Sequence, residues 1–506
     1  MTSRVTLPDI FQNNMILQRD KPIFIWGKCS SPCRLRIALG SNSIDCFSDK
    51  TDFSCALPAM EAATGLTLSI FEEGKSVPCI QLQNIAIGDI WLAGGQSNME
   101  YFLRYEAHWN ETRKLPKNPM IRMYNCPQLA FEGQQRDLPD SGYWFEDQDE
   151  AMASFSAPAY HFARTLQPSL NIPIGIIGCN WGGTPARAWV DKKYLDTPDM
   201  RFYLEEYDNY LSSQDLDALK NESMSAWELD ASYHTQMEFR ALMYGLSEAE
   251  QQVWMEQHKS DKYLPLGPYH HYRPGGLYEY MIQPIAPFAL KGVLWYQGES
   301  DVDHADIYDK MLTTVIKCWR HTWKDETLPF LLVQLAPFQK WLDCSGEDYP
   351  QLREKQDIAA HTIPNTYLTS IMDIGMYEDI HPKEKREVGR RLALLAQNHV
   401  YGMNCLSDPP EFVNASKENN TIHLTFANAG DSLSLIGDTI HALQIYQGNQ
   451  SLSICKYSIN VDTITIFLKT SSQEPMRISF AEESYCEVNL YNSAGIPAKP
   501  FHCTIE

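Results

Sequence analysis

One serine of the chain stands in a setting that favours nucleophilic catalysis. Ser97 lies in the run Gly94-Gly95-Gln96-Ser97-Asn98-Met99-Glu100, directly after an apolar stretch and at the expected start of a helix. Backbone N–H groups at a helix start lack partners and the helix dipole favours negative charge, which helps an alkoxide form and an oxyanion persist. A serine in this place is equally common as a helix cap, and the spacing is not that of a Gly-x-Ser-x-Gly elbow. The run alone leaves nucleophile and cap as alternatives.

A histidine late in the chain is the expected general base. His381 lies in Tyr377-Glu378-Asp379-Ile380-His381-Pro382, at the end of the last strand expected in an alternating region. The carboxyl ends of parallel strands meet at one edge of a sheet, so Ser97 and His381 are expected on the same rim. The rival is His304, which follows an Asp-Val-Asp run at Asp301, but those acids are expected to cap the helix that begins near His304.

Two further loops are expected at this rim. Cys179-Asn180-Trp181-Gly182-Gly183-Thr184 follows a strand, and its paired glycines let backbone N–H groups approach a reacting carbonyl oxygen, although a simple tight turn also uses such a pair. Trp295-Tyr296-Gln297-Gly298-Glu299-Ser300-Asp301 follows another strand. There the Gln297 amide is expected to donate to the oxyanion and Glu299 to hold the loop, the alternative being a glutamine that only bonds backbone.

The elements that must position these residues alternate between strand and helix. Apolar strand-like runs alternate with helical patterns, which are expected near residues 156–166, 304–323, 351–360 and 382–399. Such alternation predicts a parallel sheet with helices on both faces. The segment 192–274 interrupts the pattern, is rich in Tyr, Glu and Gln, and is interpreted as a helical insertion on the catalytic side of the sheet.

All-β regions are expected at both ends of the chain. Short period-two runs punctuated by Gly and Pro occupy residues 1–83, and strand signals bounded by Asn, Asp, Gly or Ser return over residues 406–506. The predicted organisation is an N-terminal β domain, an α/β catalytic domain over residues 84–405 that carries the insertion, and a C-terminal β domain.

Composition excludes several classes of protein. The 506 residues carry a formal charge of −22, which repels a phosphate backbone, so nucleic acid is not an expected partner. No apolar run reaches the roughly 18 residues of a membrane span, and the first residues lack the apolar core of a signal peptide.

Thirteen cysteines without a CxxC pair predict reduced thiols and a cytoplasmic protein, the alternative being a secreted or periplasmic protein whose signal peptide has been removed. No metal is expected, because the only grouped histidines lack zinc-ligand spacing: His234, His258, His270 and His271.

Ordered blocks spread from residue 15 to residue 382 resemble the sialate O-acetylesterases of the SGNH hydrolase superfamily. The blocks are, in chain order, Met15-Ile16-Leu17-Gln18-Arg19-Asp20-Lys21-Pro22 with Trp26-Gly27, Gly95-Gln96-Ser97-Asn98-Met99, Trp181-Gly182-Gly183-Thr184, Gly276-Leu277-Tyr278, Trp295-Tyr296-Gln297-Gly298-Glu299-Ser300 and Asp379-Ile380-His381-Pro382. The resemblance implies an SGNH-type, flavodoxin-like parallel sheet with helices on both faces, flanked by the two all-β domains.

The resemblance also implies roles for the residues at the rim. Ser97 is the implied nucleophile, His381 the base, and the oxyanion hole consists of the Ser97 N–H, an N–H of Gly182 or Gly183, and the Gln297 side chain. The superfamily's usual third block carries Asn where Gln297-Gly298-Glu299 stands here, a variation that resembles the branch acting on acetylated sugars.

The third member of a catalytic triad is left open by the sequence. The superfamily's usual acid stands three residues before the histidine, where this chain has Glu378, whereas Asp379 stands two before it. Asp379 is the expected partner of His381. The alternatives are Glu378, or a Ser-His dyad whose imidazole is oriented by a backbone carbonyl.

The function implied is that of a serine esterase that removes O-acetyl groups from acetylated sialic acids through an acetyl-enzyme, without metal or organic cofactor. Arg187 is the expected partner of the sialic acid carboxylate, and Trp295 and Glu299 are expected to contact substrate. Acetylxylan or another acetylated polysaccharide is the alternative substrate. A non-catalytic carbohydrate-binding protein is the alternative of another class. The expected partner is an O-acetylated sugar, with neither nucleic acid nor membrane.

Overall fold

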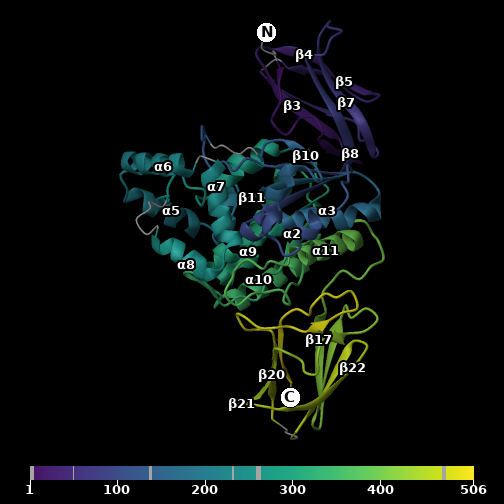
Figure 1. Cartoon of the computed structure of the whole chain (residues 1–506), viewed down its shortest axis with the longest axis vertical. Coiled ribbons are helices and arrows are strands. Elements are labelled where there is room, and N and C mark those ends of the chain that lie inside the picture. Colours follow the sequence, from purple (N-terminus) through teal and green to yellow (C-terminus); the bar gives the residue numbers. More distant parts are fainter. Residues whose placement is uncertain are drawn as a thin grey trace.

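The computed structural model describes residues 5–48, 51–135, 140–230, 233–257, 264–469 and 474–505. Three parts follow one another along the long axis, with strands at both ends and an α/β part in the middle (Figure 1). Three helices of the predicted insertion project from one side of the middle part, namely α5 (Phe202–Ser212), α6 (Leu216–Asp230) and α8 (Glu248–Gln257).

The N-terminal part consists of strands whose residues alternate between buried and exposed, as the period-two runs predict. The pattern is regular in β3 (Ile23–Cys29) and β4 (Cys33–Leu39), where every second side chain enters the core. β3 lies between β1 and β6, whereas β4 lies between β5 and β7. The remaining strands are β1 (Val5–Thr6), β2 (Ile16–Gln18), β5 (Asn42–Ser48), β6 (Asp52–Leu57) and β7 (Ala63–Glu72).

One long strand, β8 (Ile80–Gly95), joins the N-terminal part to the middle part (Figure 1). Its first half pairs with β7, and its second half lies between β11 and β12. The predicted border between residues 83 and 84 falls inside this strand. All residues from 85 to 95 are buried, because a strand covered on both faces has no solvent side.

The sheet of the middle part runs in the order β10-β9-β11-β8-β12-β13-β16. All neighbouring pairs are parallel except β10 and β9, so the predicted parallel sheet is correct for six strands and misses the antiparallel edge strand. The strands besides β8 are β9 (Ile121–Asn125), β10 (Trp144–Glu146), β11 (Ile174–Asn180), β12 (Gly292–Tyr296), β13 (Phe330–Val333) and β16 (Thr366–Thr369).

Helices cover both faces of this sheet. Trp91 and Gly94 are three residues apart on β8 and therefore point to opposite faces. The Trp91 ring contacts Phe162 of α3, with ring centroids 5.0 Å apart, whereas Gly94 packs beneath Trp319 of α9. α3 packs against α11 and α9 against α10. The bounds are α3 (Ala157–Leu170), α9 (Tyr308–Trp323), α10 (Tyr349–Thr362) and α11 (Lys385–Leu395).

The four helices predicted here are confirmed, with one correction. α9 begins at Tyr308 and not near His304, because a 3-10 segment, Glu299–Ile307, precedes it. Asp301 therefore does not cap α9. Its buried carboxylate instead accepts the backbone N–H of Ala186 at 2.8 Å.

The predicted insertion is helical. Besides the three projecting helices it contains α4 (Lys192–Leu195), α7 (Tyr233–Arg240) and a π-helical turn, Ala241–Gly245. His258 lies outside the described residues. Short elements elsewhere in the middle part are α1 (Ser97–Glu100), α2 (Trp109–Thr112), β14 (Lys340–Trp341) and β15 (Cys344–Ser345).

The C-terminal part has its own hydrophobic core between antiparallel sheets. One sheet has the order β17-β18-β23-β22, another β21-β20-β24-β26, and β19 pairs with β25. The strands are β17 (Glu411–Glu418), β18 (Thr421–Ala427), β19 (Ser434–Leu435), β20 (Leu443–Gln447), β21 (Gln450–Ser451), β22 (Ile454–Asn460), β23 (Thr463–Leu468), β24 (Met476–Phe480), β25 (Leu490–Tyr491) and β26 (Phe501–Ile505).

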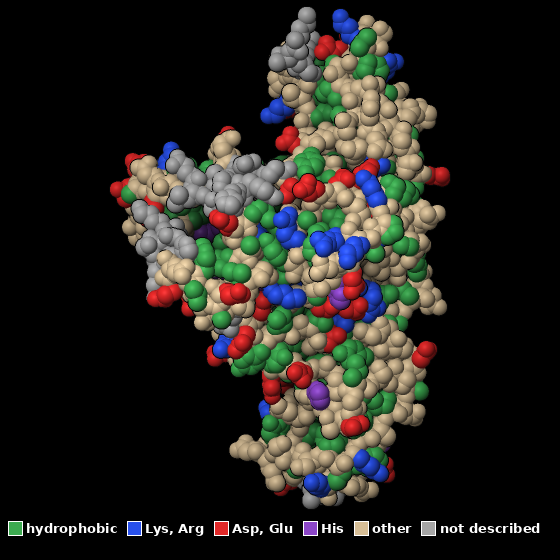
Figure 2. Space-filling view, viewed as in Figure 1, with side chains coloured by type: hydrophobic (Ala, Val, Ile, Leu, Met, Phe, Trp, Pro, Cys, Tyr) green, Lys and Arg blue, Asp and Glu red, His purple; other side chains and the backbone are tan. Residues whose placement is uncertain are grey.

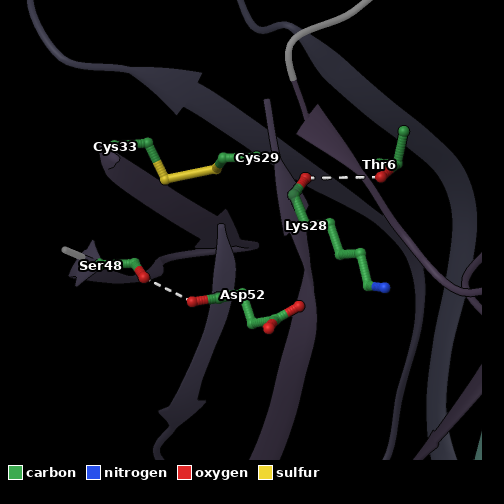
Figure 3. Close-up of a disulfide and its surroundings, with 6 residues drawn as sticks. All are labelled: Thr6, Lys28, Cys29, Cys33, Ser48 and Asp52. Carbon is green, nitrogen blue, oxygen red and sulfur yellow. Dashed lines mark hydrogen bonds between the residues drawn. A yellow bond between two sulfur atoms is a disulfide. The ribbon is translucent and has the colours of Figure 1, made fainter. Parts of the chain in front are cut away.

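Cys29 and Cys33 form a disulfide bond in the N-terminal part (Figure 3). The prediction of reduced thiols is wrong for this pair and holds for the other eleven cysteines, which are free. Cys29 ends β3 and Cys33 begins β4, so the tight connection brings their Cα atoms within 6.6 Å. The sequence spacing does not reveal this proximity, because it depends on where the two strands end.

The surface carries charge of both signs despite the net charge of −22. On the face in Figure 2, acidic side chains are spread over all three parts, whereas Lys and Arg gather over the middle part. Within the part of the chain that the structure describes, no helix combines the length and the apolar character needed to cross a membrane.

Candidate active site

The structure brings Ser97 and His381 together at the carboxyl edge of the central sheet. Ser97 opens α1 directly after β8, and His381 lies in the loop between β16 and α11. Ser97 Oγ is 3.0 Å from His381 Nε2, and the two residues are 8% and 1% exposed. This distance and burial suit proton transfer from the serine hydroxyl to a neutral imidazole.

Asp379 lies beside the far nitrogen of His381. Asp379 Oδ1 accepts the His381 backbone N–H at 2.8 Å, whereas His381 Nδ1 lies 3.4 Å from the same oxygen without a well-aligned hydrogen bond. Burial lowers the pKa of His381, and the Asp379 carboxylate offsets only part of that effect. The Asp379 carboxylate also pairs with Lys383 Nζ at 2.9 Å. Asp379 thus holds the loop through a hydrogen bond and an ion pair, whereas it has no well-aligned hydrogen bond to the imidazole.

Glu378, the alternative third member, points away from His381. Its side chain is exposed and lies 3.6 Å from Lys340 Nζ. Glu378 makes its ion pair with Lys340, whereas Asp379 lies beside the imidazole. Asp379 is therefore the acid that reaches His381.

Backbone N–H groups beside Ser97 form a candidate oxyanion hole. Within the described part of the chain, the Ser97 N–H and the Gly183 N–H have no acceptor, whereas the Gly182 N–H donates to Glu100 Oε2 at 2.8 Å. A Cβ built on Gly182 would stand 3.4 Å from the Ser97 Cβ, so this loop lies against the nucleophile. Gly183 has φ +74°, and a Cβ there would stand 2.1 Å from the Tyr272 hydroxyl. Both constraints require glycine at residue 183.

Gln297 occupies a buried network and not the edge of the site. Its Nε2 lies 3.0 Å from Gln96 Oε1, 3.3 Å from the Thr184 carbonyl and 2.5 Å from Asp301 Oδ2, while its Oε1 accepts the Tyr308 hydroxyl. Both amide hydrogens are therefore used inside the protein, and the side chain is fully buried. This arrangement argues against the predicted oxyanion contact. Gln297 instead ties the loop after β12 to the residue before the nucleophile.

Two predicted substrate contacts are core residues in the structure. Trp295 is 2% exposed and packs edge-to-face on Trp319, with ring centroids 5.4 Å apart, because it lies on the buried strand β12. Glu299 is buried as well, and its Oε1 accepts Asn98 Nδ2 at 2.5 Å. Its burial raises its pKa. The bond to Asn98 fits the other role predicted for Glu299, which is to hold the loop after β12.

Arg187 is the predicted substrate contact whose charge has no ion pair among the described residues, although it opposes the burial that raises the pKa of Asp301. Its half-buried guanidinium lies over the Tyr203 ring, 5.5 Å from the centroid, and forms no ion pair or hydrogen bond with any residue that the structure describes. Burial and the nearby Arg187 charge lower the pKa of His270 to about 4. The same charge acts against the burial that raises the pKa of Tyr272 to about 12. The His270 and Tyr272 rings pack edge-to-face with centroids 4.6 Å apart, and the Tyr272 hydroxyl lies against Gly183.

Sequence reasoning missed two polar residues that support the site. Asn98 Nδ2 donates to the carbonyl of Ile380 at 2.9 Å and to Glu299, and Asn98 Oδ1 accepts Lys385 Nζ. Asn98 thus joins the nucleophile helix to the residue before His381. Burial lowers the pKa of Lys385 to about 7. Asn98 lies within the run that contains Ser97, and Lys385 follows the run that contains His381. This nearness in the sequence was the signal that could have identified them.

One cluster outside this site combines possible metal ligands. Asp357, His361 and Glu411 bring ligand atoms within 4.8 Å of one another. Lys499 Nζ already lies 2.6 Å from Asp357 and 3.3 Å from Glu411, and His361 Nε2 lies 2.8 Å from Glu411. The cluster is therefore an ion-pair network that joins α10 to the C-terminal part.

Comparison with known families and structures agrees with the geometry. Residues 265–398 match the family described as carbohydrate esterase, sialic acid-specific acetylesterase. The predicted resemblance to sialate O-acetylesterases is confirmed. The matched segment contains Asp379, His381 and Gln297, whereas Ser97 precedes it. The family match thus covers the half of the site that carries the base.

Individual relatives extend the likeness over more of the chain. The sialate O-acetylesterase of Mus musculus is 25% identical over 379 residues, which cover 69% of this chain and 63% of that protein. The human sialate O-acetylesterase is 25% identical over 376 residues, which cover 69% of this chain and 60% of that protein. The chain therefore matches less than two thirds of the length of these relatives. A carbohydrate acetylesterase from Xanthomonas citri matches 99% of both chains with a TM-score of 0.74 and 26% identity.

Proposed function

We propose that this protein is a serine esterase that removes O-acetyl groups from acetylated sugars, with O-acetylated sialic acids as the substrate class. The observation that carries the proposal is the buried contact of Ser97 Oγ with His381 Nε2 beside the unpaired N–H groups of Ser97 and Gly183. The similarity to sialate O-acetylesterases supports the substrate class.

The proposed reaction proceeds in two steps. Ser97 Oγ attacks the acetyl carbonyl carbon while His381 Nε2 takes the hydroxyl proton, and the Ser97 and Gly183 N–H groups stabilise the oxyanion. The tetrahedral intermediate collapses, and His381 returns the proton to the departing sugar oxygen. Water then repeats the sequence on the acetyl-enzyme, which releases acetate and restores the serine hydroxyl.

Recognition of a sialic acid is assigned to Arg187. A half-buried guanidinium that lies over the Tyr203 ring and has no ion pair or hydrogen bond among the described residues is suited to a carboxylate, which it holds through charge-assisted hydrogen bonds. The Tyr272 hydroxyl lies against Gly183, its ring packs on His270, and the Arg187 charge acts on both groups, which supply further polar contacts for a sugar. The three side chains come from the loop after β11 and from the end of the insertion.

We also propose that the central sheet is of the SGNH, flavodoxin-like type. The five strands β11-β8-β12-β13-β16 have the order 2-1-3-4-5 when they are numbered along the chain, which is the flavodoxin-like order. β9 and β10 extend the sheet beyond β11. The candidate site lies at the β8 switch point of that order, where ligands of such sheets bind.

A neutral acetylated polysaccharide is the second candidate substrate. The relative that matches the whole chain is described only as a carbohydrate acetylesterase, which leaves the sugar open. We expect the protein to hydrolyse 4-nitrophenyl acetate and to deacetylate O-acetylated sialic acid with a kcat/KM at least about tenfold above that for acetylated xylo-oligosaccharide, because an additional charge-assisted contact contributes about 1.5–3 kcal/mol. Acetate release measured on each substrate checks this. The opposite preference would assign a neutral sugar, and no hydrolysis of any ester would leave a binding protein.

Replacement of Arg187 by Ala separates carboxylate recognition from chemistry. We expect the kcat/KM for O-acetylated sialic acid to fall roughly ten- to hundredfold, since a charge-assisted contact contributes about 1.5–3 kcal/mol. Hydrolysis of the uncharged 4-nitrophenyl acetate should be nearly unchanged and serves as the internal control. An equal fall for both substrates would make Arg187 structural, and no fall for either would place the carboxylate elsewhere.

The compartment is also part of the proposal. The eleven free cysteines suit the cytoplasm, as the sequence predicted, whereas the Cys29–Cys33 disulfide favours an oxidising compartment. Five of the eleven free thiols are buried and two, Cys344 and Cys455, are exposed. A disulfide needs an oxidising environment to persist. We therefore favour the secreted or periplasmic alternative.

A further inference from the structure

Glu100 is a buried carboxylate three residues after the candidate nucleophile. Its Oε2 accepts the Gly182 N–H at 2.8 Å and the Tyr244 hydroxyl at 2.9 Å. Its Oε1 accepts Gln128 Nε2 at 2.8 Å and Arg240 Nη2 at 2.6 Å. Burial alone would raise the pKa of Glu100, but the Arg240 charge and these hydrogen bonds hold it below its ordinary value.

The hydrogen bond from Gly182 links Glu100 to the candidate oxyanion hole. Gly182 lies against the Ser97 Cβ and precedes Gly183, whose N–H has no acceptor among the described residues. The Gly182 N–H is held by Glu100, and the Gly183 carbonyl accepts Ser300 Oγ at 2.8 Å. The peptide group that carries the Gly183 N–H lies between these two held groups, so the bond to Glu100 holds one side of it.

Two other partners of Glu100, Arg240 and Tyr244, come from the insertion. Arg240 ends α7, and Tyr244 lies in the π-helical turn that follows, four residues later. The Tyr244 ring packs edge-to-face on the His381 ring, with centroids 5.2 Å apart, and the Tyr244 carbonyl accepts Lys383 Nζ at 2.9 Å. One turn of the insertion therefore contacts both the loop at Gly182 and the loop that carries His381.

A second point of the insertion reaches the same histidine through Trp341. Trp341 Nε1 donates to Gln251 Oε1 at 2.7 Å, and the Trp341 ring packs edge-to-face on His381 at 5.0 Å. Gln251 belongs to α8. Of the three aromatic rings that contact His381 in the described part of the chain, the Tyr244 ring belongs to the insertion and the Trp341 ring is held by it, whereas the third, Tyr101, follows α1.

We propose that the insertion is part of the active centre, with Arg240 and Tyr244 as positioning residues that act through Glu100 on the oxyanion loop and through ring contact on His381. The proposal rests on the proposed esterase function and assigns the insertion a catalytic purpose. Misplacement of a reacting group by about 1 Å can cost about 10²-fold in rate, so such positioning is large enough to measure.

Replacement of Arg240 by Met in the full chain tests this. Arg240 is the charged group that faces Glu100, and Tyr244 is the other titratable one, so loss of the cation raises the pKa of Glu100. A protonated, neutral Glu100 is a weaker acceptor for the Gly182 N–H than the carboxylate is. We expect kcat for 4-nitrophenyl acetate to fall about 10²-fold near pH 6 with little change in KM, and the acidic limb of the rate profile to move to higher pH.

Three companion variants make the test specific. Arg240→Lys should restore most of the rate. Tyr244→Phe keeps the ring on His381, loses only the bond to Glu100, and should lower kcat severalfold with KM unchanged. Arg201→Met is the matched control, because Arg201 is an exposed arginine of the insertion that pairs with Asp196 away from the site. It should behave as the unmodified protein.

A second readout separates this proposal from the proposed function. A fluorophosphonate labels an activated serine and needs no acetyl ester, so the labelling rate of Ser97 should show the same loss and pH shift in Arg240→Met. Labelling without acetyl hydrolysis would refute the function and leave the positioning role intact. Unchanged labelling and an unchanged acidic limb in folded Arg240→Met and Tyr244→Phe would overturn the proposal, as would an unmodified protein that is not labelled at all.

Discussion

Ser97→Ala is expected to abolish esterase activity while the fold stays intact. Loss of a covalent nucleophile removes the acetyl-enzyme route and should lower kcat at least about 10⁴-fold, leaving only binding and oxyanion stabilisation. The Ser97 hydroxyl contacts His381 in a buried site, and the change removes one oxygen atom without leaving a charge unpaired. Thermal unfolding should therefore change little. Turnover of 4-nitrophenyl acetate and the unfolding midpoint measure the two effects.

A matched serine controls for general effects of the substitution. Ser212→Ala changes an exposed serine of α5 in the insertion and should retain full activity. If Ser97→Ala kept more than roughly a tenth of the unmodified turnover, the nucleophile would be another residue.

His381→Ala should be nearly as damaging as the serine change, and Asp379→Asn clearly less so. The base is lost outright in the first variant, with an expected fall in kcat of about 10⁴-fold. In the second variant the imidazole loses a carboxylate that lies 3.4 Å from Nδ1 without a well-aligned hydrogen bond, so we expect a loss of about 10- to 10²-fold. Steady-state turnover of 4-nitrophenyl acetate by each variant measures both losses.

The pH profile of Asp379→Asn tests independently whether Asp379 raises the pKa of His381. Only neutral His381 accepts the serine proton, so activity falls as pH drops through its pKa, which burial already holds below 6.5. Asp379 raises that pKa, and its neutralisation should move the acidic limb to still lower pH even though the plateau falls. Glu378→Gln is the isosteric control and should leave both turnover and the pH profile unchanged. Near-total loss in Asp379→Asn, equal to that in His381→Ala, would instead indicate a full triad.

The sequence predicts where a residue lies along a strand, but not which partners its side chain contacts. Ser97 and His381 were found because each follows a recognisable strand, and strand ends of a parallel sheet share one rim. Gln297 was found by the same argument but assigned a contact that its buried hydrogen bonds exclude. The position of a side chain at the end of a strand can be read from the chain, whereas the direction of its amide depends on which acceptors surround it.

No sequence motif identifies Tyr244 and Trp341 as residues of the site. Tyr244 lies in a weakly periodic segment, and Trp341 lies in a two-residue strand, yet both rings pack on His381. Each contact depends on how the insertion folds back over the sheet. Aromatic residues of this kind are usual in cores, so their type alone carries no functional signal.

The sequence by itself determined the alternation of strands and helices, the all-β character of both ends and the closeness of Ser97 to His381. Period and apolar runs encode these features locally, and sheet geometry converts them into a common rim. Only the tertiary structure decided that Glu100 holds Gly182, that Arg187 has no ion pair among the described residues and that Cys29 meets Cys33. Hydrogen bonds and ion pairs have a range of a few ångströms, so which partners meet is fixed by the packing of distant segments and not by spacing along the chain.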